Sequence, residues 1–382
     1  MDLLALLYNG LLEWVVHPVV RQFLGLFDLN GRMGLFFLCC SFSIAYLLFR
    51  VRKHRHLTQA RSFWQFIGGA RVFFHSSALL DYRYYFVRAI LRVVLVLPVV
   101  ALVDPLLLRS GDYVAFFTQL WGAREQVEQH LLLSLLYGLG VFLVNDFIGY
   151  WVHRAFHSKW LWAFHKVHHS APVLVPATVS RVHFVETIVE KLATLIGMGA
   201  YAGVFWYACG GEVSRYLLFG VTYLVFIFNA LAANLRHSHV WLSFGPTLEH
   251  VLNSPAQHQI HHSDAPHHHN RNFATNLSLW DWMFGTLHVT TSTPEPLRFG
   301  IGEEGRDKYQ SVYSLIVTPF IDITQSAAWR PRSWMSRFIA PTPPTSTVLP
   351  PCSTPIEVST ASPRTSNSRA ASSPSAWPGM NR

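Results

Sequence analysis

The sequence predicts an all-α, polytopic membrane protein with a core of transmembrane helices. Charged residues make up only 13% of the 382 positions, about half the share usual for soluble domains, and aromatic residues reach 14%. Uncharged apolar runs recur along the chain, and several approach the roughly 20 residues that a spanning helix needs. Composition and run length together argue against an ordinary soluble domain.

The formal net charge of +9 does not indicate a nucleic-acid partner. The Lys and Arg residues are scattered among the apolar runs and at their ends, as the positive-inside rule predicts for a membrane protein. The cysteines form no C-x-x-C pair, so neither a disulfide framework nor a thiolate metal site is expected. They are Cys39, Cys40, Cys209 and Cys352.

The first half of the chain predicts two spans and two surface segments. Residues 1–27 favour a short interfacial helix, and Met33 to Phe49 is an uncharged first span that ends in a basic cluster. Residues 60–87 are aromatic-rich with regular charges, which indicates an amphipathic segment on the cytoplasmic surface. A second span follows over residues 89–108, where two prolines allow a kink or an end.

Three further apolar runs follow. Leu131 to Trp151 predicts a third span, and residues 187–208 and 215–235 predict a hairpin that leaves the membrane face and returns to it. Counted from the basic cluster, the ends of the third and the last span both face the cytoplasm. The expected units are residues 1–60, 61–127, 128–300, a helical extension over 301–339 and a disordered Pro/Ser/Thr-rich tail over 340–382.

Histidines recur in three boxes within residues 128–300. Five lie within seventeen positions, as an H-x-x-x-H and an H-x-x-H-H, and a second H-x-x-H-H follows almost ninety residues later. Positions i, i+3 and i+4 share one helix face, so each box aims its imidazoles at one place. The box histidines are His153, His157, His165, His168, His169, His258, His261 and His262.

The boxes predict a dinuclear metal site in a cytosolic, histidine-rich cap. Eight imidazoles are too many for one tetrahedral zinc, and imidazole suits zinc, copper, iron and nickel alike. Neither the Glu-x-x-His pattern of carboxylate di-iron bundles nor the H-E-x-x-H of metalloproteases accompanies the boxes. A zinc-dependent membrane hydrolase and a non-enzymatic, histidine-rich metal-binding membrane protein remain as alternatives.

The box sequences resemble the fatty acid hydroxylase/sterol desaturase superfamily of membrane oxygenases over residues 130–290. The similar motifs are D-x-x-x-Y-W-x-H-R-x-x-H (146–157), H-K-x-H-H (165–169), R-x-H (181–183), H-Q-I-H-H-S (258–263) and N-L-S-L-W-D-W-M-F-G-T (276–286). Only seven residues separate the first two boxes, fewer than in the acyl-lipid desaturases that also use three boxes.

The resemblance implies a membrane helix core, two irons, molecular oxygen as co-substrate and an external electron donor, cytochrome b5-like or a ferredoxin/reductase. It implies hydroxylation or desaturation of a lipid C–H bond on the cytoplasmic face of a bacterial inner membrane or the endoplasmic reticulum. Residues 128–300 would be the catalytic domain. The implied metal ligands are the eight box histidines and His237.

Four further positions carry expectations. Asp146 lies two helical turns before His153, so its carboxylate is expected to hydrogen-bond a ligand imidazole. His183 matches the R-x-H motif, which leaves a ligand or supporting role open. Asp281 is expected to brace the cap. The roles of His239 and of the tract His267, His268 and His269 stay open, and neither the lipid nor the carbon that reacts follows from the sequence.

Overall fold

The computed structural model describes residues 17, 20, 24, 32–218, 221–231, 233–302 and 307–325, all within one structural unit. The expected interfacial helix over 1–27 and the tail over 340–382 therefore lie essentially outside the described residues. The long helices are α3 (Leu35–His54), α6 (Ser76–Leu91), α9 (Leu131–Phe156) and α11 (Phe184–Ala208). The shorter ones are α4 (Phe63–Phe66), α5 (Gly69–Phe73), α7 (Leu97–Val103), α8 (Ser110–Trp121), α10 (Trp162–His169), α12 (Tyr223–Ala230), α13 (Pro255–His261), α14 (Leu279–Met283) and α16 (Val312–Gln325).

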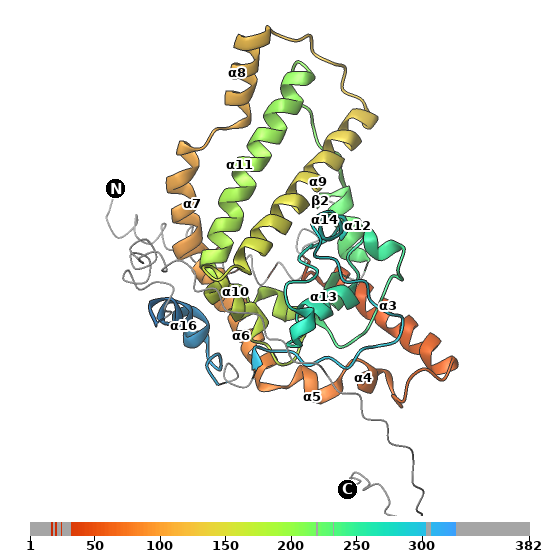
Figure 1. Cartoon of the computed structure of the whole chain (residues 1–382). Helices are drawn as coiled ribbons and strands as arrows, with labels where there is room; N and C mark the ends of the chain where they lie inside the picture. Colours follow the sequence, from red (N-terminus) through yellow and green to blue (C-terminus); the bar gives the residue numbers. More distant parts are fainter. Residues whose placement is uncertain are drawn as a thin grey trace, which may run out of the picture. The chain divides into compact units, whose positions relative to one another are not determined.

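Four helical stretches of the described chain are long and apolar enough to cross a membrane. They are Leu35–His54, Ser76–Trp121, Leu131–Phe156 and Phe184–Ala208. Figure 1 shows α8, α9 and α11 extending to one end, while α10, α13 and α16 lie at the other end of α9 and α11. The predicted transmembrane helical core is therefore confirmed, and the box-bearing segments gather at one end of it.

The second crossing differs from a simple helix. It begins at Ser76, earlier than the expected 89, and includes the π-helical turn η2 (Arg92–Val96) directly before α7, whose second residue is Pro98. Proline provides no backbone N–H, and the wider turn accommodates its ring. The 3₁₀ turn η3 (Asp104–Leu106), which contains Pro105, ends α7 and interrupts the run before α8. Both prolines thus act as the sequence predicts.

Close packing in the core depends on glycine. A Cβ added at Gly140 of α9 would meet the Tyr201 hydroxyl of α11, and one at Gly203 would meet Tyr113 of α8. A larger residue at either position would force a neighbour to shift, so α11 approaches both neighbours closely. The two-sided contact fixes α11 against α9, which carries the first box.

The predicted continuous helix over 215–235 is wrong. The structure has two paired two-residue strands, β1 (Leu217–Leu218) and β2 (Val221–Thr222), and then the eight-residue α12. This segment nevertheless runs beside the start of α9. Ser214 N–H donates to Gln129, just before α9, and the Tyr223 hydroxyl donates to the Leu135 carbonyl. The chain therefore still returns to the box end, in partly extended form.

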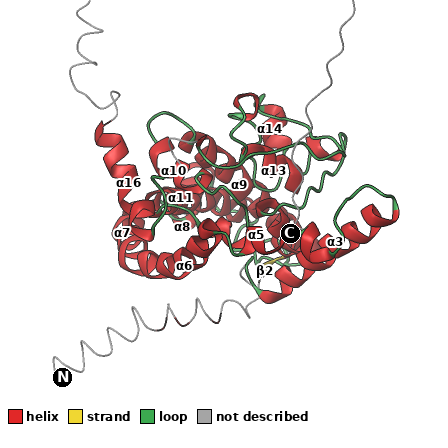
Figure 2. Cartoon of the chain, turned by 90° about the horizontal axis from the view of Figure 1, so that it is seen from below, coloured by secondary structure: helices red, strands yellow, loops and turns green. Residues whose placement is uncertain are grey.

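The cap consists of short helices joined by loops, as Figure 2 shows from below. It includes the 3₁₀ turns η4 (Pro176–Ser180), η5 (Ala233–His237), η6 (Leu248–His250) and η7 (Pro266–His268). Helix α13 begins with a reciprocal cap, in which Ser254 Oγ accepts from Gln257 N–H and Gln257 Oε1 accepts from Ser254 N–H. Pro255 occupies its first turn. The local sequence therefore fixes where α13, the helix of the third box, begins.

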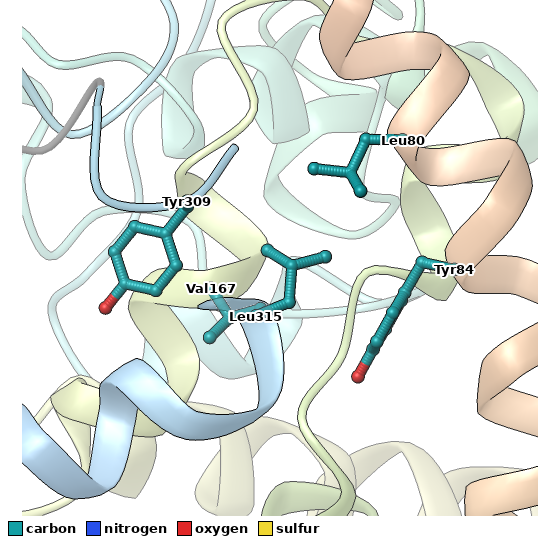
Figure 3. Close-up of a cluster of buried hydrophobic side chains, with 5 residues drawn as sticks. All are labelled: Leu80, Tyr84, Val167, Tyr309 and Leu315. Carbon is teal, nitrogen blue, oxygen red and sulfur yellow. The ribbon is translucent and has the colours of Figure 1, made fainter. Parts of the chain in front are cut away.

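Helix α10 is held in place by a buried cluster that joins three elements. Figure 3 shows Leu80 and Tyr84 of α6 around Val167 of α10, with Leu315 of α16 and Tyr309 beside them. Each side chain is at most 5% exposed. Because Val167 stands between the box histidines, this packing sets the rotation of α10. The helical extension expected over 301–339 contributes α16 to that packing.

Candidate metal centre

The structure brings nine histidines together in two neighbouring groups. Within each group, every residue offers a ring nitrogen within 4.8 Å of the others. The five-histidine group contains His153, His157, His165, His169 and His261. The four-histidine group contains His168, His237, His258 and His262. These are the eight box residues together with His237.

Each H-x-x-H-H box contributes to both groups. On α10, His165 and His169 join the five-histidine group and His168 joins the other. The third box reverses this division, because His261 joins the five-histidine group while His258 and His262 join the four-histidine group. Residues i and i+4 lie in one row along a helix and i+3 in the next. The box spacing therefore suits two adjacent sites.

The ring nitrogens lie at distances that fit a metal ion. His153 Nε2 is 3.0 Å from His165 Nε2, and His258 Nε2 is 3.1 Å from both His237 Nε2 and His262 Nε2. Imidazole nitrogens about 2.1 Å from an ion and at right angles to one another lie about 3.0 Å apart. The observed spacing matches that of ligands sharing one ion.

The tautomers support the same assignment. His153 Nδ1 donates to the Phe273 carbonyl at 2.6 Å, and His165 Nδ1 lies 2.9 Å from a Glu186 carboxylate oxygen. Both Nε2 atoms of these neutral rings then carry lone pairs, yet they face each other at 3.0 Å. Two facing lone pairs repel unless a cation lies between them. His261 repeats the pattern: its Nδ1 donates to the Arg271 carbonyl, and its buried Nε2 has no hydrogen-bond partner among the described residues.

Burial keeps these imidazoles neutral. It lowers the pKa of His168 to about 3 and those of His157, His261 and His262 well below the usual value, and neighbouring histidines lower the last three further. A neutral imidazole is the form that binds a metal. The two groups are therefore ready to bind an ion at neutral pH.

Two supporting contacts of the groups were not expected from the sequence. Glu186 lies in the first turn of α11, and Arg32 Nη2 lies 3.2 Å from His237 Nδ1. A carboxylate beside an apolar run is costly unless it has a partner, so the position of Glu186 in the sequence could have indicated such a contact. Arg32 gives no such signal, because its contact joins residues 205 positions apart.

Asp146 has partners other than those predicted. Its carboxylate accepts hydrogen bonds from the backbone N–H groups of Asn276 and Leu277, from the Asn276 side chain and from Trp280 Nε1, but from no histidine. The expected bond to a ligand imidazole is therefore corrected: Asp146 anchors the segment before α14 to α9. Helical spacing places Asp146 on the same face of α9 as His153, but the donors that reach its carboxylate come from Asn276, Leu277 and Trp280.

Asp281 braces the cap, as expected. Its carboxylate accepts from the N–H groups of Phe273 and Ala274 and from the Thr286 hydroxyl. Phe273 in turn provides the carbonyl that orients His153. Asp281 therefore helps to orient His153 by holding the backbone of Phe273.

The R-x-H motif lies outside both groups. His183 caps the N-terminus of α11 through Nδ1, and its Nε2 donates to the Ile316 carbonyl. Arg181 is 1% exposed and donates to Ser77 Oγ, while Asp81 lies 3.3 Å from its guanidinium. Both residues join α6, α11 and α16. Neither side chain belongs to the two histidine groups, although the Arg181 backbone lies beside His168.

The remaining histidines with open roles also lie apart from the two groups. His239 Nε2 accepts from Leu174 N–H, and His269 Nε2 donates to the Asp264 carbonyl. His267 is exposed, whereas His268 is buried and lies near His288 and Glu295.

One cavity adjoins the five-histidine group, and a second lies nearby in the cap. One, of about 570 Å³, is lined by His157, His169 and His261 of the five-histidine group and by polar residues that include Lys159 and Arg298. The other, of about 310 Å³, is mostly apolar and lies between α3, α12 and the start of α13, with Ile44, Phe228 and Leu252 in its wall. Both volumes are in or near the range of small-molecule sites.

Residues 138–286 match the model of the fatty acid hydroxylase family. Over this stretch the chain is similar to fatty acid hydroxylases. The match contains all nine clustered histidines, and it confirms the resemblance seen in the box motifs.

Named relatives are each similar to less than half of the chain. Ornithine lipid hydroxylase OlsE of Rhizobium tropici is 31% identical over 165 residues, which are 43% of this chain and 44% of that protein. Human alkylglycerol monooxygenase is 30% identical over 149 residues, covering 39% and 30%. The very-long-chain aldehyde decarbonylase GL1-7 of rice is 27% identical over 148 residues, covering 37% and 21%. The chain thus spans less than half the length of these relatives, and no solved structure matches it.

Proposed function

We propose that this protein is a membrane-bound, di-iron, O₂-dependent oxygenase that hydroxylates or desaturates a C–H bond of a lipid. The observation that carries the proposal is the pair of histidine groups, in which bare Nε2 lone pairs of His153 and His165 face each other at 3.0 Å. The match to the fatty acid hydroxylase family and the relatives named as lipid hydroxylase and monooxygenase support the reaction class.

The two groups are the proposed ligand sets of two irons. His153, His157, His165, His169 and His261 would hold one ion, and His168, His237, His258 and His262 the other. Iron in such a site supplies activation of O₂ for attack on an unreactive C–H bond. Five imidazoles around one ion exceed the four-coordination usual for structural zinc. This count favours iron over the alternative, a zinc-dependent hydrolase.

The chain's own residues hold and orient the ligands. The Phe273 and Arg271 carbonyls and the Glu186 carboxylate fix the Nδ1 atoms of His153, His261 and His165, so that each Nε2 points inward. Such supporting contacts set ring orientation and raise ligand basicity.

The apolar cavity of about 310 Å³ is the proposed site for the lipid chain. It lies between α3 of the membrane core, α12 and the cap, and it reaches Arg236, the residue next to the proposed ligand His237. A substrate that enters from the bilayer would exchange lipid contacts for those of Ile44, Phe228 and Leu252 at little cost. The polar cavity at His157 and His169 would serve the opposite, aqueous side.

The cap is proposed to face the cytoplasm. Residues 50–61 contain five basic and no acidic residues, and Arg52 donates to the Trp241 carbonyl, which places this end of α3 beside the cap. At the other end of α9, the connections 122–130 and 209–216 each contain one Arg and at least one Glu. The positive-inside rule then assigns the cap to the cytoplasm of a bacterial inner membrane or to the cytosolic side of the endoplasmic reticulum.

Hydroxylation consumes a C–H bond, O₂, two electrons and two protons, and yields an alcohol and water. The electrons require a donor protein, proposed to be cytochrome b5-like or a ferredoxin with its reductase. The basic surface over residues 50–61 suits an acidic donor.

The test is metal analysis combined with turnover on the purified protein in lipid nanodiscs. We expect about two irons per chain and lipid product only when both O₂ and a reductant are present. The variant His168→Ala should remain in the membrane, lose iron and form no product. Activity with zinc alone, without O₂ or reductant, would support the hydrolase instead. Metal binding without any lipid product would support the metal-binding protein.

A further inference from the structure

We propose that His268, His288 and Glu295 bind a single divalent transition-metal ion, separate from the two histidine groups. One ligand atom of each residue lies within 4.8 Å of the others. No part of the proposed oxygenase mechanism uses these residues. The site would therefore be a third metal site of the chain.

His268 gives the independent evidence for a ligand. Its side chain is only 3% exposed, and neither ring nitrogen has a hydrogen-bond partner among the described residues. The nearest charged atom, Glu295 Oε2, is 3.5 Å from Nε2, whereas a charge-assisted hydrogen bond is about 2.8 Å long. Nδ1 is therefore buried without a partner, and Nε2 has only this long ion pair with Glu295. An ion between the two side chains would satisfy the ring nitrogen that faces it.

The other two residues lie in one loop that follows α14 and reaches His268. The backbone of His288 is fixed, because its N–H donates to Asn272 Oδ1 at 2.7 Å and its carbonyl accepts from Asn272 Nδ2. The rings of His268 and His288 are 5.3 Å apart between centroids. The side chain of Glu295 is 30% exposed, so it reaches the site from the solvent side.

The donor set indicates the kind of ion. Two imidazoles and one carboxylate are a common ligand set for Zn²⁺, with a further position left for water, and they also suit Fe²⁺. An ion here would join η7, directly after the third box, to residues 288–295. The chain continues to Arg298, Gly300 and Gly302, which line the polar cavity at the five-histidine group. The ion would thus hold one wall of that cavity in place.

The test uses the full-length protein, stripped with a chelator and titrated with Zn²⁺ alone. Glu295→Gln is the main variant because its partly exposed side chain tolerates a change of charge. His267→Gln is the matched control, since it changes an exposed histidine next to the site. We expect Glu295→Gln to bind about one Zn²⁺ fewer per chain than the wild type, and His267→Gln to bind as many as the wild type.

Hydrogen exchange gives a second reading that does not depend on activity. Zn²⁺ should slow backbone exchange over residues 286–298 in the wild type and in His168→Ala, but not in Glu295→Gln. Because His168→Ala alters only the four-histidine group, the outcome separates this site from the dinuclear centre. The proposal would be overturned if Glu295→Gln bound as many Zn²⁺ ions as the wild type. It would also be overturned if Zn²⁺ did not change backbone exchange over residues 286–298 in the wild type.

Discussion

The Nδ1 atom of His165 lies 2.9 Å from one carboxylate oxygen of Glu186 and 3.0 Å from the other. The contact joins the second box on α10 to the first turn of α11. We expect Glu186→Gln to weaken metal binding by about 10- to 100-fold, as is typical when a carboxylate partner of a ligand histidine is changed. The measurement is the rate of metal loss to a chelator, with iron counted by mass spectrometry.

The control for this change is Glu190→Gln, one turn further along α11, where the side chain is exposed. It removes a carboxylate as well but makes no hydrogen bond to the box histidines among the described residues, so it should retain metal like the wild type. Equal metal retention by Glu186→Gln and the wild type would mean that the carboxylate does not support His165.

Asp146→Asn tests whether this residue acts on the fold and not on the metal. The carboxylate accepts four hydrogen bonds in a site that is 3% exposed, and an amide group there would turn N–H donors towards N–H donors. We expect a loss of unfolding free energy of about 2 kcal/mol or more. Thermal unfolding should show it, while the folded fraction keeps its metal affinity.

Asp104→Asn changes an exposed aspartate that pairs with Arg109 and should leave the unfolding midpoint nearly unchanged. If Asp146→Asn instead lost metal without loss of stability, the result would contradict this assignment and support the sequence-based prediction that Asp146 bonds to a ligand imidazole.

His183 predicts a pH dependence of stability outside the histidine groups. Burial lowers its pKa to about 4, and the bond to the Ile316 carbonyl opposes this only in part. The unfolded chain, with a pKa of about 6.5, takes up a proton first. The stabilisation is therefore fully present above pH 6.5 and is lost as the pH falls towards 4, by up to about 3 kcal/mol.

His183→Asn keeps the helix cap but does not titrate, so its unfolding midpoint should fall less between pH 7 and pH 4 than that of the wild type. His56→Asn is the control, because His56 is exposed and its φ of 56° suits asparagine. It should follow the wild-type curve. Parallel curves for His183→Asn and the wild type would refute the assignment.

The apolar cavity predicts a steric effect on the lipid. Leu252→Trp should fill part of its 310 Å³ and lower kcat/KM for a long-chain lipid by about tenfold or more, which corresponds to about 1.4 kcal/mol. Val251→Trp places the same indole at the neighbouring residue, which is 45% exposed, and should have little effect. Iron content should be normal in both. Unchanged turnover in Leu252→Trp would exclude this cavity as the lipid site.

Much of the centre could be predicted because local spacing determines it. The H-x-x-H-H pattern places its histidines on one face of α10 or α13 whatever the packing is, and the apolar runs predict α9 and α11 by length. The nine histidines named from the sequence are the nine that the structure brings together. The division of each box between two groups was not predicted, because it depends on how α10 and α13 face each other.

The errors have physical causes of the same kind. The carboxylate of Asp146 bonds to Asn276 and Trp280, which are at least 130 positions away, and helix periodicity carries no information on such contacts. Residues 215–235 are apolar enough for a helix, but apolar content alone does not separate a helix from extended chain buried in protein. The paired strands β1 and β2 satisfy each other's backbone groups, which permits the break.

The central claim is that the histidine centre inserts oxygen from O₂ into a lipid, and isotope labelling tests it most directly. The purified protein, loaded with iron and supplied with a reductant and a lipid that it converts, is incubated under ¹⁸O₂ in ordinary water. We predict an alcohol product that carries one ¹⁸O atom in the wild type and no product in His168→Ala. An alcohol whose oxygen comes from water, or turnover that continues without O₂, would contradict the account.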